Sequence, residues 1–100
     1  MSRAPRAFVY LLRCRDGSLY CGWTNDPERR LAAHRRGAGS AYVRSRLPVD
    51  MVYLERCTSV SRALKREWAI KAMTRTAKQR LVAKRSLPKP AKPPRAIRSA

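Results

Sequence analysis

The strongest sequence signal for the fold is a pair of apolar runs separated by a short polar segment, in residues 7–23, AFVYLLRCRDGSLYCGW. Ala7–Cys14 is mainly apolar with aromatic and β-branched side chains, and Ser18–Trp23 is a second run of this kind. Between them, Arg15-Asp16-Gly17 has the composition of a tight turn. The stretch therefore predicts an antiparallel hairpin with one strand on each side of that turn.

The length of the hairpin loop decides whether Tyr10 and Tyr20 can meet. A two-residue turn would pair residue 10 with 23 and place the two tyrosines on opposite faces. A three-residue loop, with Gly17 in the left-handed region, would place Tyr10, Tyr20 and Gly22 on one face. Gly22 would then leave a gap beside Tyr10 that a phosphate could enter. Because residues 8–12 are apolar at every position, both registers are open, and so is the interpretation of two ordinary strand tyrosines.

The signals after the hairpin predict one more strand and three helices. Asp26-Pro27 supplies an N-cap and a proline for the first helical position, and Gly37 would end that helix. Thr76 with Gln79 forms a capping box before the last helix. The order ββαβαα is that of a small α+β domain, a three-stranded antiparallel sheet flanked by helices. The expected elements are a helix from Pro27 to about Arg36, a loop over 37–47, a strand over Val49–Arg56, a helix from Ser59 or Ser61 to about Met73, and a helix to about Arg85.

The chain is short and strongly basic. It has 100 residues, with 24 Lys and Arg against 6 Asp and Glu, and a formal charge of +18. Residues 86–100 hold four of the seven prolines and no acidic residue, so we expect one domain over 1–85 and a disordered basic tail over 86–100. The charge favours nucleic acid as the partner, because phosphate contacts release condensed counterions.

The apolar runs and the cysteines exclude further classes of protein. No run approaches the ~20 apolar residues of a membrane helix, so no membrane partner is expected. Cys14, Cys21 and Cys57 are an odd number with no C-x-x-C spacing. A complete disulfide framework and a cysteine metal site are therefore excluded, and reduced thiols in a cytoplasmic protein are the simplest interpretation.

Two polar residues of the first predicted helix lie on one face. Arg30 and His34, the only histidine, are four residues apart and flank Leu31. Together they could contact an anionic substrate. They could equally be a surface arginine and a histidine at the negative end of the helix dipole.

Glu67 is a carboxylate on the apolar side of the long predicted helix. Such a carboxylate needs a partner. Lys71, four residues later, is one choice, and a single divalent cation is the other. The stripe that places Glu67 there consists of Val60, Ala63, Leu64 and Ile70.

Together these residues resemble the GIY-YIG nuclease superfamily, and most of all its small, stand-alone bacterial (YhbQ-like) branch. The similarity covers about residues 7–83 and includes the stretches DGSLY, ERRLAAH, RLPV and REWAIK. Phe8 and Cys21 depart from the glycine and isoleucine of the two motifs. The residues that carry the resemblance, in order, are Val9-Tyr10, Tyr20-Cys21-Gly22, Arg30, His34 and Glu67.

The resemblance implies a GIY-YIG-like fold and hydrolysis of phosphodiester bonds with one Mg²⁺ or Mn²⁺ ion. It also favours the three-residue hairpin loop, because the tyrosines of the family share a site. Glu67 would be the metal ligand. The other catalytic residues implied are Tyr10, Tyr20, Arg30 and His34. The residues expected to contact nucleic acid are Gly22, Arg44, Arg46 and Lys71.

We therefore expect an endonuclease that acts on structured or damaged DNA in repair or recombination. It would work as a monomer without a small-molecule cofactor, and RNA is a second potential substrate. One alternative is a nucleic-acid-binding module of the same fold with little or no catalysis. Another is a basic protein associated with RNA or the ribosome.

Overall fold

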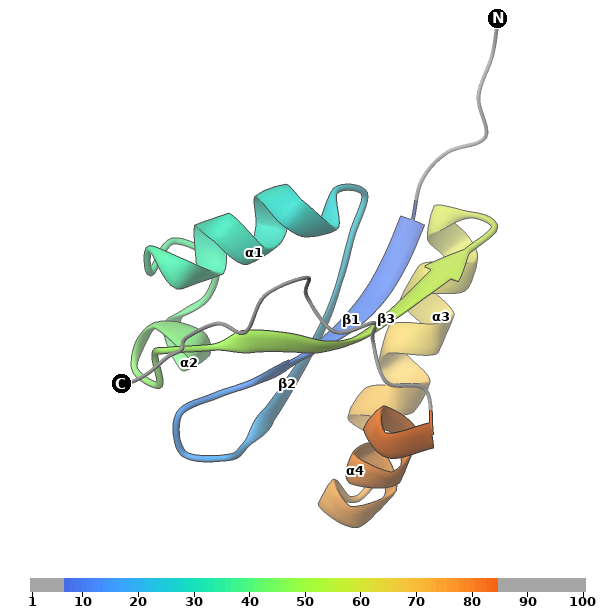
Figure 1. Ribbon diagram of the computed structural model, residues 1–100. Helices are drawn as coiled ribbons and strands as arrows, with labels where there is room; N and C mark the ends of the chain where they lie inside the picture. Colours follow the sequence, from blue (N-terminus) through green and yellow to red (C-terminus); the bar gives the residue numbers. More distant parts are fainter. Residues whose placement is uncertain (1–6, 85–100) are drawn as a thin grey trace, which may run out of the picture.

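The computed structural model describes residues 7–84, which form a three-stranded antiparallel sheet between two layers of helices (Figure 1). The predicted basic tail, residues 86–100, lies outside the described residues. No helix within residues 7–84 is long and apolar enough to cross a bilayer. The elements are β1 (Ala7–Arg13), β2 (Leu19–Thr24), α1 (Pro27–Arg35), α2 (Ala41–Arg44), β3 (Asp50–Cys57), α3 (Val60–Lys71) and α4 (Arg75–Lys84).

β1 lies at the centre of the sheet and is covered on both faces. The strand order is β2-β1-β3, which leaves β2 at an edge. In Figure 1, α1 and α2 lie on one side of the sheet, and α3 and α4 lie on the other. Val9 and Leu11 are fully buried with residues of α3, whereas Tyr10 and Leu12 are buried towards α2. Two covered faces explain why residues 8–12 are apolar without alternation.

The hairpin has the three-residue loop. Tyr10 pairs with Gly22 across β1 and β2. The N–H of Gly17 donates to the carbonyl of Cys14 at 2.9 Å, and Gly17 has a φ of +86°, which glycine adopts without steric cost. Tyr10, Tyr20 and Gly22 therefore share the face that α1 and α2 cover, as one of the two predicted registers requires.

The helix starts follow the capping residues, with one exception. Asp26 caps α1 and Ser59 caps α3, each accepting a backbone N–H from three residues on. The capping box predicted at Thr76 is wrong. α4 begins at Arg75, and the hydroxyl of Thr74 accepts the N–H of Ala77 at 3.1 Å.

The expectation of a plain loop over residues 37–47 is also wrong. Ser40 caps the four-residue helix α2, and Val43 of this helix is fully buried. Arg46 anchors the end of the segment: its guanidinium lies 3.2 Å from the Asp16 carboxylate in the hairpin loop. The segment thus packs, together with α1, on the face of the sheet opposite α3 and α4.

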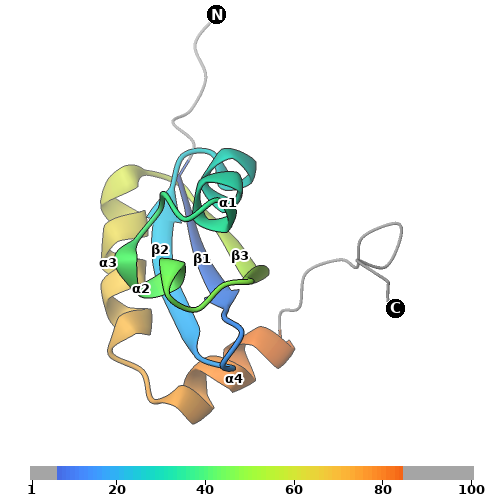
Figure 2. The same cartoon turned by 90° about the vertical axis from the view of Figure 1, so that its left-hand side faces the viewer.

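α3 buries less of its apolar stripe than the helical period predicts. Ala63 and Ile70 are fully buried, but Val60 and Leu64 are exposed. Figure 2 shows α3 displaced towards the edge strand β2, although its buried residues also pack with those of the central strand β1. One flank of the helix therefore extends past the sheet, and Trp68 lies on that flank with 75% of its surface exposed.

Ile70→Ala should lower the free energy of unfolding by about 2–5 kcal/mol, because it removes buried methyl groups and leaves a cavity. Leu64→Ala, on the exposed flank of the same helix, should change it by less than about 1 kcal/mol. Urea unfolding followed by circular dichroism measures both. Equal losses would contradict the packing of α3 described here.

Candidate active site

Tyr10 lies against the bare backbone of Gly22. A Cβ atom at Gly22 would be 2.5 Å from the Tyr10 hydroxyl oxygen, so a side chain there would displace the ring. The Tyr10 hydroxyl and Nε2 of His34 form a buried hydrogen bond of 2.9 Å. The space over Gly22 is thus occupied by the Tyr10 ring. The gap that this register predicted for a phosphate is therefore filled.

His34 is buried between the two tyrosines and the loop after α1. Its ring meets that of Tyr20 edge to face, with centroids 5.5 Å apart. Gly39 passes so close to Nδ1 that a Cβ atom there would clash with the imidazole. Nδ1 is buried and has no hydrogen-bond partner among residues 7–84. Burial, followed by the charge of Arg30, lowers the pKa of His34, so its imidazole is neutral at pH 7.

Tyr10 is held as a protonated phenol. Burial is the largest cause that raises its pKa above the ordinary value, and the nearby Tyr20 adds to the rise. Arg30 on α1 opposes the shift, and Glu67 on α3 reinforces it. Burial is therefore the dominant reason that the Tyr10 hydroxyl keeps its proton.

A stack of side chains continues from Tyr20 to the end of α2. Tyr42 stacks on Tyr20 with ring centroids 5.9 Å apart, and the Arg46 guanidinium lies 3.7 Å from the Tyr42 centroid. Arg46 also donates to the carbonyl of Tyr42 and to the carboxylate of Asp16. Arg46, expected to follow the substrate backbone, is thus engaged within the protein. The sequence pattern does not indicate that Tyr42 contacts Tyr20. The only local signal is Ser40, a residue typical of a helix N-cap, two positions earlier.

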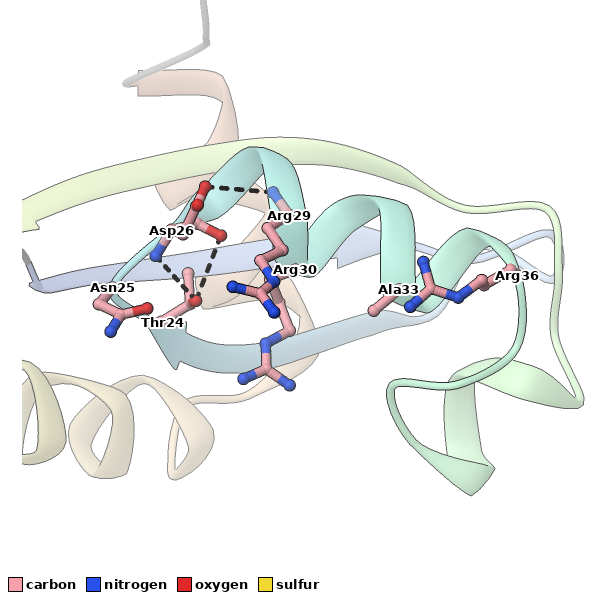
Figure 3. A pocket seen from close by; sticks show the side chains of 7 residues that line it. All are labelled: Thr24, Asn25, Asp26, Arg29, Arg30, Ala33 and Arg36. Carbon is pink, nitrogen blue, oxygen red and sulfur yellow. Dashed lines mark hydrogen bonds between the residues drawn. The ribbon is translucent and has the colours of Figure 1, made fainter.

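Three arginines, two on α1 and one directly after it, line a pocket of about 300 Å³ at the end of β2 (Figure 3). They are Arg29, Arg30 and Arg36. The one carboxylate in the pocket, that of Asp26, accepts the backbone N–H of Arg29 as the helix cap. The three guanidinium groups have no acidic partner among residues 7–84. The pocket is therefore suited to an anion such as a phosphate.

Glu67 lies on α3 with its side chain 18% exposed. Its carbonyl accepts a weak contact of 3.9 Å from Sγ of Cys21, which places this turn of α3 against β2. Its carboxylate pairs with Nζ of Lys71 at 3.4 Å, the i,i+4 pair that the sequence allowed. Lys71 is exposed, as is Arg44 at the end of α2. These two predicted nucleic-acid contacts are open to solvent on opposite sides of the sheet.

Glu67 is the carboxylate that the resemblance implies for a divalent ion. No group of three or more His, Cys, Asp or Glu side chains within residues 7–84 is arranged to hold a metal. An ion at Glu67 would take its remaining ligands from water and from a phosphate, a coordination typical of Mg²⁺.

The three cysteines are free and buried. Burial is the main cause that raises the pKa of Cys21 to about 12, so this thiol stays protonated. A buried, protonated thiol is a poor nucleophile. Cys21 therefore acts in packing between β2 and α3.

The comparison with known families gives the class of the domain, which is of the nuclease type. The GIY-YIG catalytic domain matches residues 6–80, and the chain belongs to this family. The family and the fold expected from the sequence are thus confirmed.

Its relatives are small proteins of about the same extent. The UPF0213 protein of Clostridium perfringens is 45% identical over 80% of this chain and 86% of its own length. The UPF0213 protein of Natronomonas pharaonis is 49% identical over 76% of this chain and 89% of its own.

Two solution NMR structures share the fold. The UPF0213 protein of Bacillus halodurans is 37% identical, with a TM-score of 0.52 over 78% of this chain and 83% of that one. A protein of E. faecalis is 38% identical, with a TM-score of 0.56 over 84% and 90% of the two chains.

Gly22→Ala should lower the free energy of unfolding by about 1–3 kcal/mol, because the methyl group displaces the Tyr10 ring and breaks its hydrogen bond to His34. In a Tyr10→Ala background the same substitution should cost much less, since the obstructing ring is gone. Urea unfolding of the four proteins of this cycle measures the difference. An equal cost in both backgrounds would show that the ring is not the obstacle.

His34 should titrate below the ordinary histidine midpoint of about 6.5. Because its pKa is lowered in the folded state, its contribution to stability is complete above about pH 6.5 and is lost as the pH falls through the folded-state pKa. His34→Gln should therefore weaken the fall in stability between about pH 7.5 and about pH 5.5. NMR titration of this single histidine gives the midpoint directly. A midpoint at or above the ordinary value would contradict its burial as a neutral imidazole.

Proposed function

We propose that this protein is a cytoplasmic, monomeric endonuclease that uses one divalent cation to hydrolyse phosphodiester bonds in structured or damaged DNA, in repair or recombination. One observation carries the proposal: the hairpin contacts both candidate helices, because Tyr10 is hydrogen-bonded to His34 on α1, the helix of Arg30, and Cys21 contacts the carbonyl of Glu67 on α3. A phosphodiester would lie between the basic pocket on the side of α1 and the Glu67 carboxylate on the side of α3.

Arg30 would hold the scissile phosphate. A guanidinium presents a planar fork of donors that matches phosphate oxygens, and no acidic residue of the described chain pairs with Arg30. Arg29 and Arg36, in the same pocket, would hold neighbouring phosphates of the strand. Donors that are already in place stabilise the charge that develops on the phosphoryl oxygens.

Glu67 suits one Mg²⁺ or Mn²⁺ ion. Its carboxylate is partly buried, and its partner Lys71 is an exposed lysine whose ion pair is easily exchanged. A bound ion would supply Lewis-acid stabilisation of the phosphoryl and leaving oxygens. Glu67 would hold it beside the phosphate that Arg30 binds.

Tyr20 would accept the proton of the attacking water. Its ring is half-buried, whereas the Tyr10 phenol is buried, protonated and bound to His34. A phenolate on Tyr20 would need a positive charge to stabilise it, and Arg30 would supply that charge. Tyr10 would then position the site, and the neutral imidazole of His34 is the alternative proton acceptor. Water would bond to phosphorus as the bond to the 3′ oxygen breaks, leaving 5′-phosphate and 3′-hydroxyl ends.

One observation favours the alternative of a binding module without catalysis. The ammonium group of Lys71 lies 3.4 Å from the Glu67 carboxylate, where a divalent ion would have to bind. A module of this kind would hold nucleic acid through its arginines, and its affinity would not depend on metal.

Arg30→Ala and Glu67→Gln should each lower the rate of metal-dependent cleavage by about 100-fold or more, because each removes a preorganised charge. Arg35→Ala is the matched control, since Arg35 lies on the same helix but pairs with Asp50, and it should change the rate by less than about threefold. The assay uses supercoiled plasmid, single strands, flaps, junctions and RNA, with Mg²⁺ or Mn²⁺ against EDTA.

Binding measured in EDTA separates the remaining outcomes. Tight, salt-sensitive binding without cleavage of any substrate would establish the binding module. Cleavage that persists in both variants would contradict the site, and a preference for RNA over DNA at matched salt would establish the RNA-associated protein.

A further inference from the structure

The exposed flank of α3 carries an apolar stripe beside Glu67. Val60, Leu64 and Trp68 follow one another at four-residue intervals and are 37%, 46% and 75% exposed. Residues three or four apart share a helix face, so Leu64 adjoins Glu67, and Trp68 adjoins Lys71. The stripe therefore lies directly next to the pair formed by Glu67 and Lys71.

Trp68 is flanked by positive charge on both sides. Lys65 precedes it by three residues and Lys71 follows by three, and both lysines are exposed. An aromatic ring between cations fits a strand of nucleic acid, in which bases alternate with phosphates along one chain. A second copy of this protein is a poorer occupant, because two surfaces of a chain with charge +18 repel each other.

We propose that Trp68 stacks on an unpaired base of the substrate, while Lys65 and Lys71 contact the phosphates on either side of that base. The proposal rests on the proposed function in assuming a nucleic-acid substrate, and it narrows the class of that substrate. In an intact duplex the faces of the bases are covered by their neighbours. An exposed tryptophan beside the reacting phosphate therefore selects nucleic acid with unpaired nucleotides next to the cut, such as a flap, a gap or a single strand.

The fluorescence of Trp68 tests this contact directly. The chain has two tryptophans, and Trp23→Phe leaves Trp68 as the only one. In EDTA, where no metal-dependent cleavage occurs, a short single-stranded oligothymidylate should quench this fluorescence. A duplex of equal length should bind through its phosphates and quench it much less.

Trp68→Ala should weaken binding of the single strand by about tenfold and leave duplex affinity within about twofold. Trp68→Phe, which keeps an aromatic ring, should recover most of the loss. Leu64→Ala removes apolar area from the same stripe without removing a ring, and it should leave both affinities unchanged. Because Trp68 is exposed, none of these variants should disturb the fold, which circular dichroism verifies.

Three results would overturn the proposal. Equal quenching by the single strand and the duplex would do so, as would unchanged single-strand affinity in Trp68→Ala. So would sedimentation showing self-association that is lost in both Trp68→Ala and Leu64→Ala, because a second copy would then cover the stripe. A protein that cuts DNA but fails the quenching test loses only this inference, whereas one that passes the test but cuts nothing loses only the catalytic proposal.

Discussion

The contact between the Tyr10 ring and the bare backbone of Gly22 is the constraint on which the site depends. It allows the Tyr10 hydroxyl to reach His34, and this hydrogen bond joins β1 to α1 across the edge strand. The contact exists because Gly17, at a φ of +86°, closes a three-residue loop and pairs residue 10 with residue 22. A shift of one residue would send the two tyrosines to opposite faces. A single left-handed glycine thus determines whether the site can form.

The two sides of the edge strand have different chemistry. On the side of α1, three arginines without acidic partners in the described chain line a pocket at the end of β2. On the side of α3, one carboxylate is accompanied by an exposed apolar stripe. In Figure 2, β2 lies at the edge of the sheet with α3 beside it. Under the proposed function, a nucleic-acid strand that crosses this edge would meet the arginines first, and then Glu67 and Trp68.

Interactions between residues close in the sequence made the strands and most helix starts predictable. The features that the sequence did not predict depend on tertiary packing. Capping residues and hairpin composition act over a few positions, so strands and most helix starts follow from them. The helix over 41–44 is too short to show a helical repeat of apolar residues, so the sequence does not predict it. Its role is to bury Val43 against the sheet. Val60 and Leu64 are exposed because only one side of α3 packs on the sheet, and a helical period does not indicate how wide the packed side is. Sequence spacing, with the resemblance that it carries, points to Tyr10, Tyr20, Arg30 and His34, and the structure brings both tyrosines into contact with His34. The approach of Gly39 to His34 depends on a loop conformation that no spacing predicts.

Under the proposed function, Arg30 and Glu67 act on one phosphate across the edge of β2. Single-turnover cleavage by the Arg30→Ala, Glu67→Gln and double variants tests this claim most directly. Groups that act as a unit are strongly non-additive, so the double variant should be about as slow as the slower single variant. A rate loss in the double variant equal to the product of the two single losses would show that the residues act independently, and would contradict a shared site.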